Sequence, residues 1–180
     1  MESSEQTKSR YIYRGHVVNL RLDTVEQGDG SETVTEIVEH AECIAVVAVD
    51  DRENVLLVRQ FRRAIGKELL EIPAGGIDSG ESAEDAVRRE MQEETGFLPQ
   101  KLERLGGFYS SPGFCTEYLH LYLATGFTPS RLFAEDTEDI SVVRVPVKDV
   151  SALLASGRIQ DSKSLAGLHM YLTRFAGKAK

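Results

Sequence analysis

The chain lacks the features of a disulfide-bonded, membrane-spanning or nucleic-acid-binding protein. It has 2 cysteines, Cys43 and Cys115, which give no disulfide framework and fit a reducing cytoplasm. No apolar stretch reaches the roughly 18 residues of a membrane span. The net charge is −8, and the densest basic cluster is Arg59, Arg62 and Arg63. That cluster suits one or two phosphates but not a nucleic-acid groove.

The length of 180 residues suits one domain with a modest extension. Residues 1–10 are polar and lack the apolar centre of a signal peptide, so we expect a flexible tail. Residues 11–40 indicate an antiparallel β-hairpin that turns at residues 28–31. Because an isolated hairpin is marginal in water, it must pack on the main body or on a second subunit. The predicted division is 1–42 for tail and hairpin and 43–180 for the main domain.

The main domain mixes strand and helix patterns along its whole length. A continuous apolar run at residues 43–49 is typical of a strand buried on both faces. Ser82, three residues before Asp85, resembles a capping box, and Gly96 suits a helix end. The pattern favours an α/β (α+β) fold with a mixed sheet and helices on its faces. The other expected elements are strands at 55–61, 69–72, 105–109, 118–124 and 140–145, and helices at 83–95, 147–155 and 163–175.

The helix expected at residues 83–95 carries carboxylates on its apolar face. At about 100° per residue, Glu90 and Glu94 project into the apolar stripe, and Glu93 lies at its edge. Burying unpaired charge is costly, and carboxylates four residues apart repel each other. Arg89 supplies one compensating charge, and a divalent ion such as Mg²⁺ would supply two more. The alternative reading is a solvated acidic face with incidental spacing.

The region from Gly75 to Phe97 resembles the Nudix box at every defined position. Five residues separate Gly75 from Glu81, and seven separate Glu81 from Arg89. Residues 89–97 are Arg-Glu-Met-Gln-Glu-Glu-Thr-Gly-Phe. The match fixes seven residue identities and two apolar positions across 23 residues, so chance agreement is negligible. The resemblance covers most of the chain. It implies a Nudix-type α/β/α sandwich with an N-terminal antiparallel β-hairpin extension.

The resemblance also implies a reaction, the hydrolysis of a nucleoside diphosphate linked to another group. Divalent metal, Mg²⁺ or Mn²⁺ in its place, would neutralise the phosphate oxygens and activate water. Arg89 would orient the glutamates and, with Glu93, serve catalysis, while Glu81 and Gly75 would support the helix and its loop. The implied metal ligands are the carbonyl of Ala74 and the carboxylates of Glu90, Glu93 and Glu94.

Four further segments resemble the ADP-ribose pyrophosphatase subgroup, whose products are AMP and ribose 5-phosphate. Within them, Arg62 would contact the diphosphate and Pro112 would lie in the substrate-binding loop. Because the sequence does not fix the base or sugar pocket, another sugar nucleotide, such as ADP-glucose or GDP-mannose, is the alternative substrate. The four segments are residues 38–40, 58–62, 71–75 and 110–114.

Members of this subgroup are homodimers whose N-terminal strands cross to the partner and help to bind the nucleoside. Val17 and Glu36 occupy the matching places in this chain. Thr35 departs from the pattern, since relatives often have an arginine there. The chain also has no Trp to stack on adenine, so Tyr11, Tyr13 or an apolar side chain is the expected substitute.

Members of this subgroup often have a glutamate on a late loop as general base, which the resemblance places in the acidic loop at residues 134–139. Aligned on the strand that follows, Glu138 is the candidate, with Glu135 and Asp139 as alternatives. The four histidines show no metal-ligand spacing and are expected to be structural or at the surface.

Two other activities stay open. One is a non-catalytic nucleotide sensor, although such modules usually lose a box glutamate that this chain keeps. The other is a nucleoside triphosphatase, which Pro112 and the hairpin disfavour.

Overall fold

The computed structural model describes residues 7–134 and 139–175, which fall into two units. The first unit runs to Glu42 and includes Tyr109–Tyr118, and the second comprises the described residues of 43–108 and from Leu119 onward. The boundary after Glu42 is where the sequence places it, but Tyr109–Tyr118 do not belong to the main domain as expected. The reason is backbone pairing with strand β3. Val38 N donates to Phe114 O (2.7 Å), and Thr116 N donates to Val38 O (3.0 Å).

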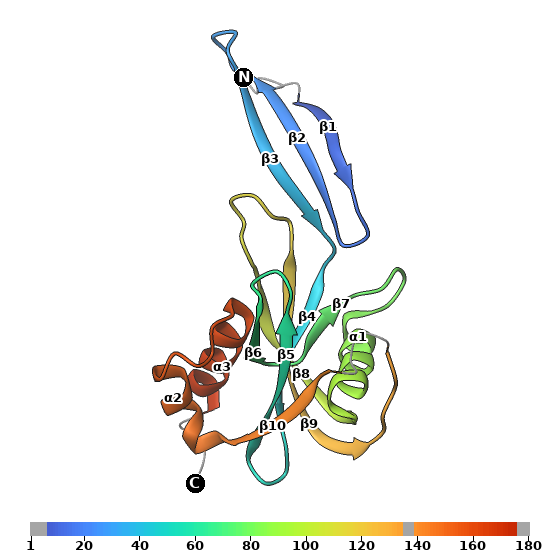
Figure 1. The fold of residues 1–180 in the computed structure, drawn as a ribbon, viewed down its shortest axis with the longest axis vertical. Helices are drawn as coiled ribbons and strands as arrows, with labels where there is room; N and C mark the ends of the chain where they lie inside the picture. Colours follow the sequence, from blue (N-terminus) through green and yellow to red (C-terminus); the bar gives the residue numbers. More distant parts are fainter. Residues whose placement is uncertain (1–6, 135–138, 176–180) are drawn as a thin grey trace. The chain divides into compact units, whose positions relative to one another are not determined.

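The first unit is built on a three-stranded antiparallel sheet in the order β1-β2-β3 (Figure 1). Its strands are β1 (Thr7–Arg14), β2 (Val18–Glu26) and β3 (Glu32–His40). The hairpin of β2 and β3 is confirmed, with its turn closed by a hydrogen bond from Gln27 N to Ser31 O (2.7 Å). The expected tail is wrong for residues 7–10, which pair with β2 as part of β1. A polar strand at a sheet edge gives no apolar alternation to detect.

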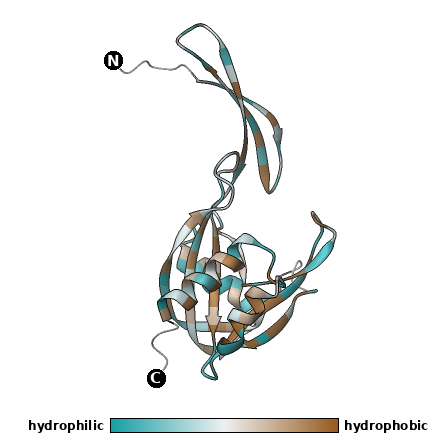
Figure 2. Ribbon diagram, turned by 90° about the vertical axis from the view of Figure 1, so that its left-hand side faces the viewer, coloured by the Kyte–Doolittle hydropathy of each residue, from teal (hydrophilic) through white to brown (hydrophobic). Residues whose placement is uncertain are grey.

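The second unit is built on a mixed sheet in the order β10-β5-β4-β9-β8, with β6 beside β5 and β7 beside β4. Strands β4 and β9 run parallel, whereas β5 is antiparallel to β4, β6 and β10. Several of these strands are hydrophobic along much of their length (Figure 2). The strands are β4 (Cys43–Val49), β5 (Asn54–Arg62), β6 (Lys67–Glu71), β7 (Ala74–Gly76), β8 (Phe97–Tyr109), β9 (Tyr118–Pro129) and β10 (Ser141–Pro146).

Helices cover both faces of this sheet, as the sandwich prediction requires (Figure 1). They are α1 (Ala83–Glu90), continued by the π-helical η1 (Met91–Thr95), and α2 (Val147–Ala155) and α3 (Ser162–Phe175). Every residue of β4 is buried, and its side chains alternate between two apolar clusters. Ile44 and Val46 pack with α1 and η1, whereas Ala45 and Val47 pack with α2 and α3.

Two local features of the second unit differ from the prediction, and both lie at or beside the motif of residues 75–97. The helix expected through Thr95 changes to π-helical geometry at Met91, a rare form that is frequently found at functional sites. Residues Ala74–Gly76, expected as loop, form the short strand β7 against Cys43–Ala45. No helix in the described part of the chain is long and apolar enough to cross a membrane.

Candidate active site

Helix α1 is fixed at both ends and along one face. The Ser82 hydroxyl accepts a hydrogen bond from Asp85 N (3.1 Å), so Ser82 caps the helix as predicted, and the same hydroxyl donates to Asp85 Oδ2 (2.6 Å). Val87 and Met91 are fully buried against the sheet. Gly96 ends the π-helical turn with φ of 78°, a left-handed conformation that glycine adopts without strain. The acidic side chains near the end of this helix therefore stand on a rigid support.

Glu94 is the most deeply buried of these acids, with 5% of its surface exposed. Its Oε2 accepts a hydrogen bond from Ala74 N (3.1 Å), which ties the helix to β7. Burial, and next the charge of Glu90, raise the pKa of Glu94 to about 8. The Ala74 hydrogen bond and the positive charges of Arg62 and Lys163 act in the opposite direction and do not offset burial.

Arg89 joins the remaining acids into one network. Its Nε and Nη2 donate to both oxygens of Glu81, each at 2.9 Å. Its Nη1 donates to Glu90 Oε1 (2.7 Å) and Glu93 Oε2 (3.2 Å), and its Nη2 also donates to Gly76 O (2.8 Å). The hydrogen bonds from Arg89 are the largest cause that lowers the pKa of Glu81. One guanidinium thus orients three carboxylates and the β7 loop.

Gly75 lies directly against the carboxylate of Glu90. A Cβ at this position would stand 1.9 Å from Glu90 Oε1 and 2.0 Å from its Cδ. The space that a side chain would need is therefore the space of the Glu90 carboxylate. This close approach explains why a glycine is needed at the first position of the motif.

The charges and donor atoms of this cluster fit a divalent metal ion. The guanidinium of Arg89 is hydrogen-bonded to three of the four carboxylates, those of Glu81, Glu90 and Glu93, whereas Glu94 accepts a hydrogen bond from the backbone N–H of Ala74. A buried acid whose pKa is raised lacks sufficient positive charge nearby. Carboxylate and carbonyl oxygens are the ligands of hard ions such as Mg²⁺. The residues present therefore suit such an ion.

A family model described as the NUDIX domain matches residues 39–168, more than half of the chain. The match includes every carboxylate of this cluster. The chain belongs to the Nudix family. It is a Nudix hydrolase, and members of the family generally use divalent metal.

Two curated relatives cover most of this Nudix chain. An ADP-ribose pyrophosphatase of Bacillus subtilis (strain 168) is 36% identical over 155 residues, which are 85% of this chain and 84% of the relative. A GDP-mannose pyrophosphatase of Yersinia pestis (strain Pestoides F) is 30% identical over 168 residues, 87% of this chain and 83% of the relative. The resemblance to ADP-ribose pyrophosphatases is thus confirmed at the level of the hydrolase subgroup.

A solved structure titled as an ADP compounds hydrolase shares the fold. It covers 98% of this chain and 97% of its own, with a TM-score of 0.87 and 21% sequence identity. At that identity the likeness concerns the fold alone. It confirms the Nudix architecture with N-terminal antiparallel strands.

The other predicted site residues are divided between the two units. Arg62, at the end of β5, belongs to the second unit with the carboxylates. Val17, 67% exposed in the β1–β2 turn, Glu36 on β3 and the exposed Pro112 belong to the first. The proposed general base Glu138 and the alternative Glu135 lie outside the described residues. Asp139 is described and is exposed.

Pro112 lines a pocket of about 410 Å³ in the first unit. Tyr109 and Tyr118 also line it, with ring centroids 5.0 Å apart and planes at 72°. Sequence reasoning considered Tyr11 and Tyr13 as substitutes for the missing tryptophan and overlooked this pair. The two tyrosines lie at the ends of separate strands, and their spacing in the sequence carries no signal of the contact.

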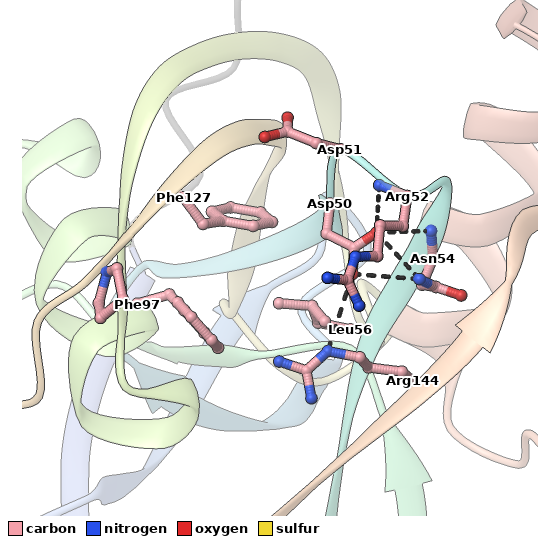
Figure 3. Close-up of a pocket in the computed structure, with 9 residues that line it drawn as sticks. Asp50, Asp51, Arg52, Asn54, Leu56, Phe97, Phe127 and Arg144 are labelled. Atoms are coloured by element: carbon pink, nitrogen blue, oxygen red, sulfur yellow. Dashed lines mark hydrogen bonds and ion pairs between the residues drawn. The ribbon is translucent and has the colours of Figure 1, made fainter.

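A larger pocket, of about 480 Å³, lies within the second unit, and none of the box carboxylates lines it (Figure 3). Asp50 and Asn54, which line it, follow the C-terminal end of β4, whereas the residues of β4 that pair with β7 lie at its N-terminal end. Asp50 accepts hydrogen bonds from the backbone N–H groups of Arg52 and Asn54, which makes it a turn residue. None of the predicted site residues lines this pocket. Its lining is Asp50, Asp51, Arg52, Asn54, Leu56, Phe97, Phe127, Pro129 and Arg144.

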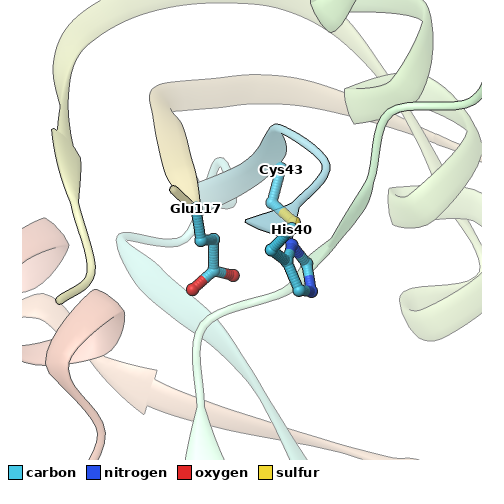
Figure 4. Close-up of side chains that lie close together, drawn as sticks. All are labelled: His40, Cys43 and Glu117. Carbon is cyan, nitrogen blue, oxygen red and sulfur yellow. The ribbon is translucent and has the colours of Figure 1, made fainter. Parts of the chain in front are cut away.

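One histidine approaches a possible metal-ligand partner, against the expectation from spacing. In the first unit, ligand atoms of His40 and Glu117 lie within 4.8 Å of each other (Figure 4). His40 Nδ1 is also 2.7 Å from Ala41 O. Both residues belong to the first unit, whereas the carboxylates of the Nudix box belong to the second.

Proposed function

We propose that this Nudix hydrolase cleaves the diphosphate bond of ADP-ribose, giving AMP and ribose 5-phosphate, with Mg²⁺ as its metal. The observation that carries the proposal is the carboxylate cluster at Gly75, in which Glu94 is buried and short of positive charge. The greater identity to the relative named for ADP-ribose supports this substrate. The relative named for GDP-mannose keeps another sugar nucleotide as the second candidate.

The side chains of the box divide the work of binding metal and fixing geometry. Glu90, Glu93 and Glu94, with the carbonyl of Ala74, would hold the ion. When bound, the ion supplies charge that neutralises the diphosphate oxygens and lowers the pKa of water. Arg89 holds Glu90 and Glu93 in place through its hydrogen bonds. These hydrogen bonds fix the two carboxylates relative to each other, as preorganised catalysis requires.

Other residues are assigned to the substrate and to proton transfer. Arg62 has a partly exposed side chain and would bind the diphosphate. Val17, Glu36 and Pro112 would contact the nucleoside, as the resemblance implies. Glu138 is proposed as the general base that takes a proton from the attacking water.

A substrate panel tests the proposed function. The purified protein is incubated with ADP-ribose, ADP-glucose, GDP-mannose and ATP, with Mg²⁺ or Mn²⁺, and kcat/KM is measured for each. We expect the largest kcat/KM for ADP-ribose, release of AMP, and loss of activity with a chelator. A larger kcat/KM for GDP-mannose would make that compound the substrate in place of ADP-ribose. Binding of ADP-ribose without turnover in the presence of either metal would indicate a non-catalytic sensor.

We also propose a homodimer formed through the strands of the first unit. None of the described residues of this unit is buried, although a three-stranded sheet needs an apolar face to be stable. Ile12, Tyr13, Val17 and Val34 are apolar or aromatic and exposed. A second copy of the sheet is the partner expected to cover them.

Light scattering at micromolar concentration should give a mass twice that of the chain. The variant Ile12→Glu places a charge on the exposed sheet and should shift the mass toward that of one chain. Lys148→Glu, at an exposed position of α2, is the matched control and should leave the dimer intact. A parent protein of monomeric mass would contradict the dimer.

A further inference from the structure

A second charged cluster lies beside the carboxylates and includes residues of helix α3 that the Nudix box does not contain. Glu71, at the end of β6, has no exposed surface. Arg62 donates to it twice, from Nε to Oε1 (2.8 Å) and from Nη2 to Oε2 (2.6 Å). Lys163 of α3 donates to the same Oε2. Glu71 is therefore held between two cations from different elements.

The contact with Glu71 leaves part of Arg62 available to a ligand. The Arg62 side chain is 39% exposed, and the bonds to Glu71 use Nε and one side of Nη2. Its Nη1 has no hydrogen-bond partner within residues 7–134 and 139–175. A guanidinium fixed along one edge presents its other edge in a set direction, which suits a phosphate oxygen.

The electrostatics of Glu71 require both cations. Burial alone raises the pKa of Glu71, but the hydrogen bonds and charges of Arg62 and Lys163 outweigh burial and hold the pKa below its usual value. If Lys163 were absent, the buried carboxylate would depend on Arg62 alone, and it would draw that guanidinium inward. The orientation of Arg62 thus depends on a residue that does not touch it.

Helix α3 holds Lys163 in a fixed position. Asp161 Oδ1 accepts hydrogen bonds from Lys163 Nζ (2.9 Å) and Ser164 N (3.0 Å). The buried Ser164 hydroxyl accepts a hydrogen bond from Ile72 N (2.8 Å), next to Glu71. These contacts lock the first turn of α3 to the end of β6, the elements seen side by side in Figure 1. Lys163 is only 14% exposed, so it offers little surface to a substrate.

We propose that Lys163 is a positioning residue for the reaction: it shares Glu71 with Arg62 and so aims Arg62 at the diphosphate. The proposal rests on the proposed function, because it takes Arg62 as the diphosphate ligand. The charges of Arg62 and Lys163 both reach Glu94, so this cluster adjoins the carboxylate centre. The first turn of α3 is then part of the substrate-binding machinery, although its sequence shows no motif.

A double-mutant cycle in the full-length protein tests this role. Lys163→Met should raise KM for ADP-ribose by about tenfold, the size of effect seen when an outer partner of a site residue is lost, with a smaller change in kcat. In an Arg62→Ala background the same substitution should change KM by less than about twofold, because the residue through which it acts is gone. Lys163→Arg keeps the charge and should restore most of the affinity. Lys148→Met is the matched surface control.

The outcomes separate this proposal from the proposed function. A full tenfold loss in the Arg62→Ala background, or no loss in folded Lys163→Met, would overturn the positioning role. If Lys163→Met fails to fold, the KM values of Lys163→Arg and Lys163→Gln are compared in the same cycle. The cycle is also repeated without turnover, by calorimetric measurement of ADP-ribose affinity in the presence of a chelator. If ADP-ribose is not the substrate, the preferred sugar nucleotide of the panel takes its place, and the same coupling is expected.

Discussion

Gly75→Ala is expected to lower kcat/KM by about a hundredfold while it changes the melting temperature little. The added methyl group would occupy the position of the Glu90 carboxylate, which is 1.9 Å from the ideal Cβ at its nearest oxygen. Glu90 is a side chain with freedom to rotate, so the protein can accept the methyl group by moving it. The backbone need not move, and stability is preserved. The moved carboxylate, however, no longer stands where the proposed metal ion needs it.

Gly76→Ala is the matched control for this prediction. A Cβ at Gly76 would meet nothing within 4 Å, and the residue directly follows Gly75 in the same strand. Its carbonyl still accepts the Arg89 hydrogen bond in the variant. We expect kcat/KM within about twofold of the parent, as for other surface substitutions. Equal losses in the two variants would mean that loop flexibility, and not displacement of Glu90, governs activity. Kinetics at several Mg²⁺ concentrations and thermal melts measure both.

The sequence predicted the second unit well because its signals are local. The run at residues 43–49 is a strand buried on both faces, and α2 has the predicted bounds. The burial of Glu94 and the partial burial of Glu90 and Glu93 follow the predicted apolar stripe. Periodicity at a fixed angle could not foresee the π-helical turn, because it assumes one geometry along the whole helix.

Contacts between distant segments were beyond the reach of sequence reasoning. Glu71 and Lys163 are brought together by the packing of α3 on the sheet, and a buried ion pair leaves no periodic pattern. The pairing of Val38 with the loop at Phe114 also joins segments far apart in the sequence. The segment containing Glu71 did carry a signal, since it resembled the ADP-ribose pyrophosphatase subgroup. Lys163 carried none.

Glu94→Gln should reduce kcat by at least about a hundredfold and, without metal, make the protein more stable at high pH. Gln keeps an oxygen for the hydrogen bond from Ala74 N but cannot carry the negative charge that a metal ion needs. Activity within a few-fold of the parent would remove Glu94 from the proposed metal ligands. Arg88→Gln, on the same helix and paired with Glu84, is the control and should retain activity.

The pH dependence of stability gives an independent measure of the same carboxylate. The pKa of Glu94 is about 8 in the folded protein and 4.5 in the unfolded chain. Between these values the folded state binds more protons, so this group lowers the free energy of unfolding as pH rises from 4.5 to 8. Glu94→Gln removes that dependence. Without metal, it should therefore melt close to the parent at pH 5 and at least about 5 °C above it at pH 8.

At pH 8, added Mg²⁺ should make the parent melt at a higher temperature than the variant. A bound ion compensates the charge of Glu94 in the parent, whereas the variant lacks this carboxylate as a ligand. The parent should then gain stability with rising Mg²⁺ concentration, and the variant should gain much less. Equal gains in both proteins would place the ion elsewhere. The burial of the Glu94 carboxylate thus destabilises the metal-free protein and also favours the binding of a divalent cation.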